Sequence, residues 1–196
     1  MKFTVGWLKE HLDTQATLNQ IVEKLTMVGL EVEKVTDRAK GLETFVVGYV
    51  VEAKQHPNAD RLRVCQVDTG TEKVELVCGT PNAKTGMRGV FAPGGSYIPG
   101  TNITLKPTEI RGVMSNGMLL SEREMGISDE HDGIIELDDS AQVGDRVVDV
   151  MGLSDPIIEI AITPNRGDCL GVRGIARDLA AAGLGALNPL ANGPVP

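Results

Sequence analysis

The pattern of apolar and polar residues divides the chain into two mixed ends and a middle rich in short strands. Near the start, apolar residues recur every three or four positions, which predicts a helix over 17–28. Thr17 and Gln20 have the spacing of a capping box, and Gly29 is placed to end the helix in a left-handed conformation. The apolar face consists of Leu18, Ile21, Val22 and Leu25.

From about 44 to 150 the pattern changes to short alternating runs separated by Gly, Pro, Asn and Asp. Such regularly spaced strands and turns predict a small β-barrel, with a helical turn near 121–125. A five-stranded, partly open oligonucleotide-binding barrel with a few extra strands fits this length. The runs are 44–54, 62–69, 73–78, 88–91, 103–110, 117–120 and 134–137.

The two ends of the chain each carry one helix stripe and one strand, and neither offers a core of its own. We expect a short helix at 7–12 and a strand at 31–36 in the first end, and a strand from 157 and a helix at 170–183 in the last. Joined, the ends would form one small α+β domain. The sequence therefore predicts an α+β fold in which an oligonucleotide-binding barrel is inserted into a split domain. The expected boundaries are 1–40 and 152–190 for the split domain, 41–151 for the barrel, and 191–196 for a linker or chain end.

Charge is distributed unevenly along the chain, whose formal net charge is −8. Residues 52–123 carry nine Lys and Arg against seven Asp and Glu, whereas residues 124–149 carry one Arg against nine Asp and Glu. A mildly basic barrel followed by an acidic stretch counts against strong phosphate binding by the whole surface. No apolar run is long enough for a membrane span, and no signal-peptide pattern begins the chain. We expect a cytoplasmic protein.

The segment HPNADRL at 56–62 predicts a rigid corner between two strands, because Pro57 restricts the backbone. In one interpretation Lys54, Arg61 and Arg63 surround this corner at the barrel mouth and contact phosphates, with a polar contact from Asn58. In the other, 57–60 only shape the corner and the His at 56 caps it. The residues alone do not choose between the two.

A second distinctive segment, KPTEIRGVMSNGMLLSEREMG at 106–126, places Lys106 and Arg111 near a glycine-containing loop. Its glycines permit close approach of a ligand, Ser115 offers a polar contact, and Met118 a soft apolar one. The Ser-Glu pair at 121–122 lacks a third partner of a catalytic triad, so no catalytic role is expected.

Other candidate chemistry is weaker. Cys78 follows an apolar strand with no neighbouring base and is expected to be a buried thiol, as are the other two cysteines. The three histidines stand alone, so no metal site is expected. In the segment 162–181, Arg166, Arg173 and Arg177 are offset by Asp168 and Asp178, which favours a solvated or subunit-facing surface; Asp168 is alternatively a helix cap.

The motifs together resemble a known family. VGYVVEAKQHPNADRLRVCQVDTG, VCGTPN and IRGVMSNGMLLSEREMG resemble the tRNA-binding oligonucleotide-fold domain of synthetase-associated proteins. MVGLEVEKV at 27–35 and ITPNRGDCLGVRGIARDLAA at 162–181 closely resemble the N-terminal region of the bacterial phenylalanyl-tRNA synthetase β subunit. The resemblance extends to about residue 190.

This resemblance implies a fragment of a ligase that joins phenylalanine to tRNA with ATP and magnesium. It implies an α-subunit partner in an α2β2 assembly, with the catalytic site on that partner and no cofactor on this segment. A complete, stand-alone tRNA-binding protein is the alternative. The expected nucleic-acid-binding residues are Lys54, Asn58, Arg61, Arg63, Lys106, Arg111, Ser115 and Met118.

Overall fold

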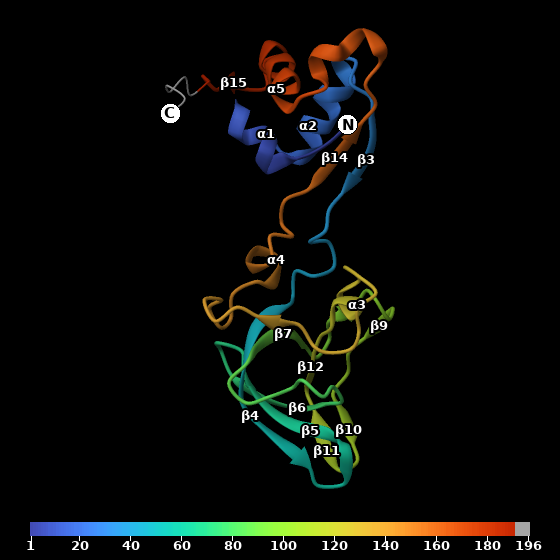
Figure 1. Cartoon of the computed structure of the whole chain (residues 1–196), viewed down its shortest axis with the longest axis vertical. Helices are drawn as coiled ribbons and strands as arrows, with labels where there is room; N and C mark the ends of the chain where they lie inside the picture. Colours follow the sequence, from blue (N-terminus) through green and yellow to red (C-terminus); the bar gives the residue numbers. More distant parts are fainter. Residues whose placement is uncertain (191–196) are drawn as a thin grey trace. The chain divides into compact units, whose positions relative to one another are not determined.

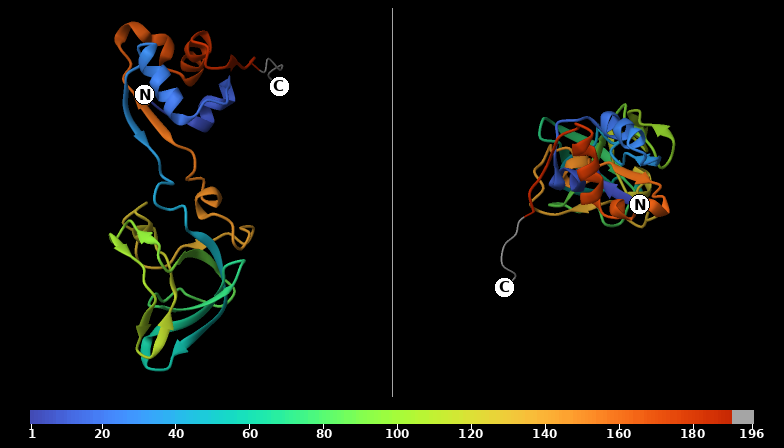
Figure 2. Two further views of the ribbon diagram at one scale, coloured as in Figure 1. Left: turned by 180° about the vertical axis from the view of Figure 1, so that it is seen from behind. Right: turned by 90° about the horizontal axis from the view of Figure 1, so that it is seen from above.

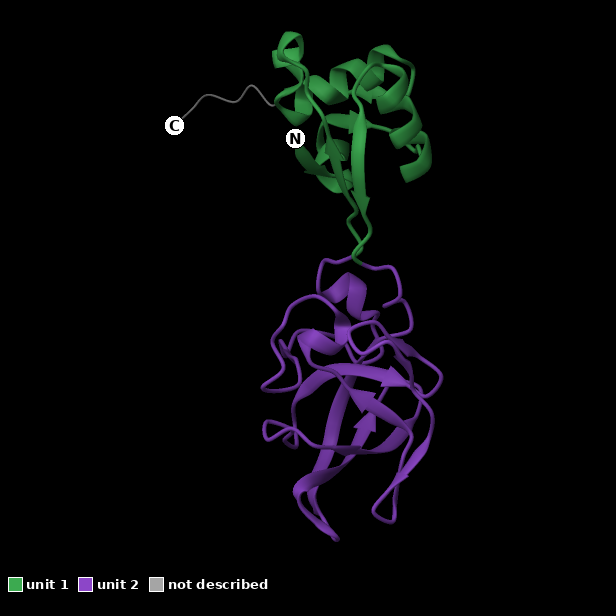
Figure 3. Ribbon diagram, turned by 90° about the vertical axis from the view of Figure 1, so that its right-hand side faces the viewer, with its two compact units in different colours: residues 1–38, 154–196 green, residues 39–153 purple. Residues whose placement is uncertain are grey.

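The computed structural model describes residues 1–190 and divides the chain into two compact units (Figure 3). The barrel unit comprises 39–153, and the split unit comprises 1–38 and the chain from 154 onward. The predicted fold class, a barrel inserted into a split α+β domain, is confirmed. The segment 191–196, expected to be a linker or chain end, lies outside the described residues.

The split unit is built on a three-stranded antiparallel sheet with its strands in the order β1-β14-β3. Figure 1 labels two of these strands, β14 and β3, side by side. The central strand comes from the second half of the chain and both outer strands from the first half. This pairing joins the two ends directly through backbone hydrogen bonds. The strands are β1 Lys2–Thr4, β3 Val32–Thr36 and β14 Ile157–Ile160, and a further pair joins β2 Leu12–Asp13 to β15 Ala186–Leu187. The helices are α1 Val5–His11, α2 Leu18–Met27 and α5 Val172–Ala181, with a 3₁₀ segment at Pro164–Cys169.

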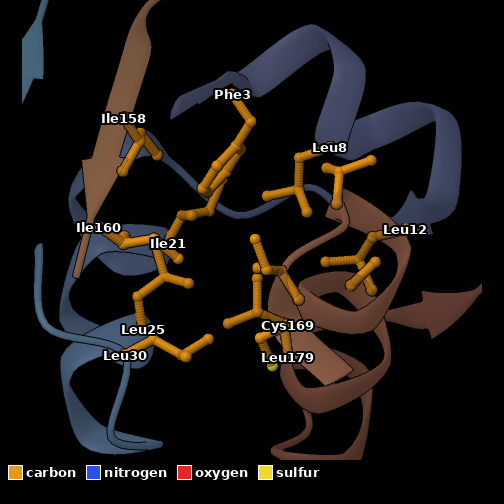
Figure 4. Packing of buried hydrophobic residues seen from close by; sticks show 13 residues of the cluster. Phe3, Leu8, Leu12, Ile21, Leu25, Leu30, Ile158, Ile160, Cys169 and Leu179 are labelled. Carbon is orange, nitrogen blue, oxygen red and sulfur yellow. The ribbon is translucent and has the colours of Figure 1, made fainter. Parts of the chain in front are cut away.

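One hydrophobic core contains side chains from both ends (Figure 4). Ile21 and Leu25 of α2 share it with Ile158 of β14 and Leu179 of α5, and all four are fully buried. Each such side chain contributes roughly 1.5–3 kcal/mol by leaving water. Because the apolar stripes of α2 and α5 meet in this core, the two ends fold as a single unit.

Helix α2 has the ends that its sequence predicts. The Thr17 side chain accepts from the Gln20 backbone N–H, and the Gln20 side chain accepts from the Thr17 backbone N–H, which completes a capping box. At the other end Gly29 has φ +83°, and the Leu30 N–H donates to the Leu25 carbonyl. This is a Schellman arrangement, and it requires the left-handed conformation that glycine adopts without strain.

The barrel unit contains a twisted sheet with its strands in the order β12-β7-β4-β5-β6. The long strands β4 and β5 form its centre, and alternate residues of β5, Cys65 and Val67, point into the interior. The strands are β4 Val46–His56, β5 Ala59–Asp68, β6 Lys73–Cys78, β7 Arg88–Pro93 and β12 Gly117–Leu119, and β13 Glu136–Leu137 also pairs with β7.

The barrel closes where the loop around Ser115 meets β6, which is otherwise the last strand of the sheet. The Val77 N–H donates to Ser115 Oγ at 3.1 Å, and the Asn116 N–H donates to the Glu75 carbonyl at 3.0 Å. Ser115 is 7% exposed, and its hydroxyl in turn donates to the Gly117 carbonyl. We call these contacts the seam. They satisfy backbone groups that an open sheet edge would leave unpaired.

Glycine is required at position 117, directly beside the seam. A Cβ there would lie 2.5 Å from Cε2 of Phe91 and 2.8 Å from the Ala92 carbonyl oxygen. The absence of a side chain thus lets β12 lie close against β7.

The prediction of one strand over 103–110 is wrong. The structure has two short strands there, and Pro107, which has no N–H to donate, lies between them. Each pairs in its own hairpin: β8 Tyr97–Ile98 with β9 Ile103–Thr104, and β10 Thr108–Ile110 with β11 Val113–Ser115. The helical turn expected near 121–125 is α3 Glu122–Met125, while α4 Val147–Val150 was not anticipated. Among the described residues, no helix has the length and apolar character needed to cross a membrane.

We predict that Ser115→Ala destabilises the barrel unit by about 1–3 kcal/mol, because the Val77 N–H loses its acceptor. The measurement is urea unfolding followed by tyrosine fluorescence, since both tyrosines, Tyr49 and Tyr97, lie in the barrel unit. Thr101→Ala, at an exposed position of the barrel unit, should change stability by less than about 0.5 kcal/mol. Equal stability of the two variants would contradict a closing role for Ser115.

Candidate nucleic-acid interface

The turn at Pro57–Asn58 is a two-residue link between β4 and β5, held from within by His56. The Asn58 N–H donates to Nδ1 of His56 at 3.0 Å, so the ring proton is on Nε2, which lies 3.1 Å from the Ile110 carbonyl. His56 is 2% exposed. The histidine therefore shapes the corner, as one of the two interpretations of the sequence expected.

A second hairpin, β10–β11, lies against this corner. Its turn is Arg111–Gly112, with φ values of +51° and +91°, which are typical of a type I′ turn. The Asn58 side-chain amide donates to the Arg111 carbonyl at 3.0 Å, and Nη1 of Arg111 donates to the Asn58 carbonyl at 3.2 Å. Figures 1 and 2 show the two hairpins side by side. Both residues are exposed, and the remaining N–H groups of Arg111 are available to a ligand.

Arg61 and Arg63 lie on the same side of β5, in line with the interior residues Cys65 and Val67. Together with the turn Gly79–Pro81, they line a pocket of about 350 Å³. Among residues 1–190 neither guanidinium forms an ion pair with a carboxylate. The lining also includes Asp60, so the pocket has two guanidinium groups against one carboxylate, and this net positive charge suits an anion.

Lys54 differs from these arginines because its ammonium group pairs with Glu52 at 2.8 Å. Both side chains are largely exposed, so the pair contributes little stability. Lys54 is therefore a weaker candidate for a phosphate contact than Arg61 or Arg63.

The other predicted residues gather at a second pocket of about 280 Å³, which includes Lys106, Ser115 and Met118. The Ser115 hydroxyl is occupied by the seam, so its assignment as an RNA contact stays a prediction. Most of the wall is apolar, from Val77, Leu105, Ile110 and Met118, and Lys106 and Thr108 add polar groups. The sequence motif contained Ser115 and Met118, but it gave no sign that Leu105 and Ile110 would complete the pocket.

The aromatic side chains of the barrel leave little surface for base stacking. Phe45 and Phe91 are buried. Tyr49 is half-buried, and the Cζ atom of Arg88 lies over its ring, 5.7 Å from the ring centroid. Tyr97, with 47% exposure, presents a ring to solvent.

The candidate nucleophiles have structural contacts. Ser121 caps α3 through a capping box with Glu124. Cys78 is buried with Sγ 3.0 Å from Oγ1 of Thr80. Burial raises the pKa of the Cys65 thiol to about 12.

The split unit contains a network of two arginines and two aspartates around a buried cysteine. Arg166 bonds both Asp168 and Asp178, and Arg177 bonds the same two carboxylates. Asp168, Cys169 and Asp178 are close enough to share a cation, but the two guanidinium groups already neutralise the carboxylates. The suggestion that Asp168 caps a helix is wrong, because α5 follows Gly171 and has no side-chain cap.

Comparison with known proteins agrees with a barrel of the oligonucleotide-binding type. The family described as "Putative tRNA binding domain" matches residues 45–146, and the chain belongs to this family.

Curated relatives extend the similarity over the whole chain. It is 58% identical to the phenylalanine–tRNA ligase β subunit of Cereibacter sphaeroides, covering 100% of this chain and 25% of that protein. It is also 58% identical to the β subunit of Rhodospirillum rubrum, covering 94% of this chain and 23% of that protein. The resemblance to these β subunits is thus confirmed, and the chain spans about a quarter of their length. A solved structure of a MetRS related protein from Pyrococcus horikoshii aligns with 27% identity over 53% of this chain and 87% of that one, at a TM-score of 0.39, too low to support an argument.

We predict that the Asp168 network stabilises the split unit in a pH-dependent way. Hydrogen bonds from Arg166 and then Arg177 lower the pKa of Asp168 to about 2, from a usual value near 3.8. A lowered carboxyl pKa contributes stability above the ordinary pKa and loses it as the pH falls toward 2. The stability difference between the parent chain and Asp168→Asn should therefore be full above about pH 4 and shrink toward pH 2.

Fluorescence of Trp7, the single tryptophan, follows unfolding of the split unit in this test. Glu33→Gln, at an exposed position, provides the matched loss of one carboxylate. A difference for Asp168→Asn that stays constant from pH 6 to pH 2 would contradict the lowered pKa.

Proposed function

We propose that the barrel unit is an accessory tRNA-binding module of a phenylalanine–tRNA ligase β subunit. The observation that carries this proposal is the pair Arg61 and Arg63, which lack carboxylate partners among the described residues and line a polar pocket within the family segment. Guanidinium groups bind phosphate oxygens through paired hydrogen bonds, and backbone phosphates supply most of the affinity for nucleic acid.

The interface that we propose begins at this pocket and continues across the two hairpin tips. Asn58 and Arg111 hold the tips together, and the remaining N–H groups of Arg111, an exposed residue, are available to a phosphate. Lys54 and Lys106 add positive charge, and Ser115 and Met118 complete the predicted set at the second pocket. Arg61 and Arg63 lie on strand β5, whose ordered backbone reduces the entropy lost on binding.

We expect this segment alone to bind tRNA weakly. The stretch 124–149 has a net charge of −8 and follows the basic residues directly in the barrel unit. Like charges on one small unit oppose approach of a polyanion, and the effect is largest at low salt.

The remaining features of the enzyme are proposals that follow from the resemblance to phenylalanine–tRNA ligase β subunits. The whole protein would pair with an α subunit in an α2β2 assembly in the cytoplasm and charge tRNA with phenylalanine, using ATP and magnesium. We assign no residue of this chain to catalysis, ATP or magnesium. The split unit would then serve assembly, and the barrel unit would contact tRNA.

The test is the salt dependence of tRNA binding by the 196-residue chain, measured by fluorescence anisotropy with labelled tRNA. Affinity should fall steeply between about 50 and 150 mM salt. The double variant Arg61→Gln, Arg63→Gln should reduce the slope of log K against log salt by about one to two units, because up to two phosphate contacts are lost.

A matched double variant controls for the change in net charge. Lys84→Gln with Arg146→Gln removes two positive charges that are already paired with Glu136 and Asp149. It should leave the slope unchanged to within about half a unit. Equal slopes for both double variants would exclude Arg61 and Arg63 as phosphate contacts, and no binding at low salt would overturn the proposed function.

A further inference from the structure

The apolar pocket beside the seam has a chemistry that phosphate binding does not explain. Val77, Leu105, Ile110 and Met118 form its walls, whereas Lys106 is exposed and Thr108 lies on the exposed strand β10. The Ser115 hydroxyl, the polar group from the sequence motif, already accepts from Val77 and donates to Gly117. The pocket thus combines apolar walls with one exposed cation, Lys106.

The volume of the pocket limits its occupant. At about 280 Å³ it lies below the range of roughly 300–1,000 Å³ that is usual for drug-sized ligands. A single planar ring system fits this limit, whereas a stacked pair of bases or a folded peptide does not. The thioether of Met118 favours an aromatic occupant, because sulfur makes favourable contacts with ring edges.

The rest of the barrel offers few alternatives for holding a base. Phe45 and Phe91 are buried, and Tyr49 lies beneath Arg88. Proteins that bind single strands usually stack bases on several exposed rings, and here Tyr97 is the aromatic residue of the barrel that is exposed. An unstacked base would therefore make its apolar contacts with the walls of this pocket rather than with aromatic side chains.

We propose that this pocket receives one unstacked nucleobase of the RNA and that Lys106 contacts the phosphate of the same nucleotide. The inference rests on the proposed function and adds a subsite to it. The base would be held by shape and apolar contact, because the polar groups of the wall are few and Ser115 is engaged in the seam. The subsite would therefore accept a base with little discrimination by hydrogen bonding.

The pocket can be blocked without removing any group of the seam. Thr108→Trp places a large ring at an exposed position of the pocket, and Thr104→Trp makes the same change at an exposed position that does not line it. Thr108→Trp should weaken tRNA binding roughly tenfold, the effect of one lost base contact, whereas Thr104→Trp should leave the affinity within about twofold. Loss of binding by both variants, or by neither, would overturn the subsite.

A direct measurement uses the Met118 methyl group in the 196-residue chain labelled with ¹³C-methyl methionine. Titration with AMP should shift the Met118 signal, whereas ribose 5-phosphate should not, and the shift should be lost in Thr108→Trp. Lys106→Gln should weaken AMP binding several-fold and leave adenosine binding unchanged. Because this assay reports folding through the other methionine signals, a variant that fails to fold is recognised directly.

The outcomes separate this inference from the proposed function. If tRNA binds and the Arg61, Arg63 variant weakens it, but AMP leaves Met118 unchanged, the subsite is wrong and the phosphate interface stands. If a phenylalanine-containing peptide shifts Met118 and AMP does not, the pocket is a protein-docking site and the proposal is overturned. If the chain binds no tRNA at any salt concentration, the proposed function fails while AMP binding is still decided by the titration.

Discussion

The barrel unit depends on the seam between Ser115–Asn116 and strand β6. Two hydrogen bonds, Val77 N–H to Ser115 Oγ and Asn116 N–H to the Glu75 carbonyl, join the last strand of the sheet to the loop that leads into β12. Without them β6 would present an open edge, and the hairpin β10–β11 would be held by its contacts with His56 and Asn58 alone. The Ser115 hydroxyl thus accepts the hydrogen bond that a backbone carbonyl would accept in a regular strand pair.

The seam also connects the two candidate pockets. Ser115 ends β11, so fixing it fixes the hairpin whose turn holds Arg111 against Asn58. The Ile110 carbonyl of the same hairpin lies within hydrogen-bonding distance of His56, which sets the corner before Arg61. The basic pocket and the apolar pocket are therefore positioned by one continuous set of hydrogen bonds, which suits a surface that binds without large rearrangement.

Local signals in the sequence predicted the elements well where caps and periodicity were strong. Helix α2 has the capping box at Thr17 and the left-handed Gly29 that its sequence indicates. The shared core of the two ends followed from a packing argument, since neither α2 nor α5 had a partner in its own segment. The strand expected over 103–110 failed because Pro107 and two separate hairpins break it.

The sequence predicted which types of residue form the candidate site, but not which residues hydrogen-bond to one another within it. The sequence singled out Ser115 for its polarity, yet its seam role depends on Val77, 38 positions away, which no local pattern encodes. Likewise Asp168 is bound by Arg166 and Arg177 rather than capping α5, because the chain adopts a 3₁₀ segment before Gly171.

The most direct test of the closed barrel is native-state hydrogen exchange at the amides of Val77 and Asn116. Closure predicts that both amides are protected nearly as strongly as the Val50 amide, which donates to the Met87 carbonyl in the middle of the sheet. Exchange of Val77 and Asn116 at the rate of exposed turns, with Val50 still protected, would show that the barrel is open at the seam and would contradict this account.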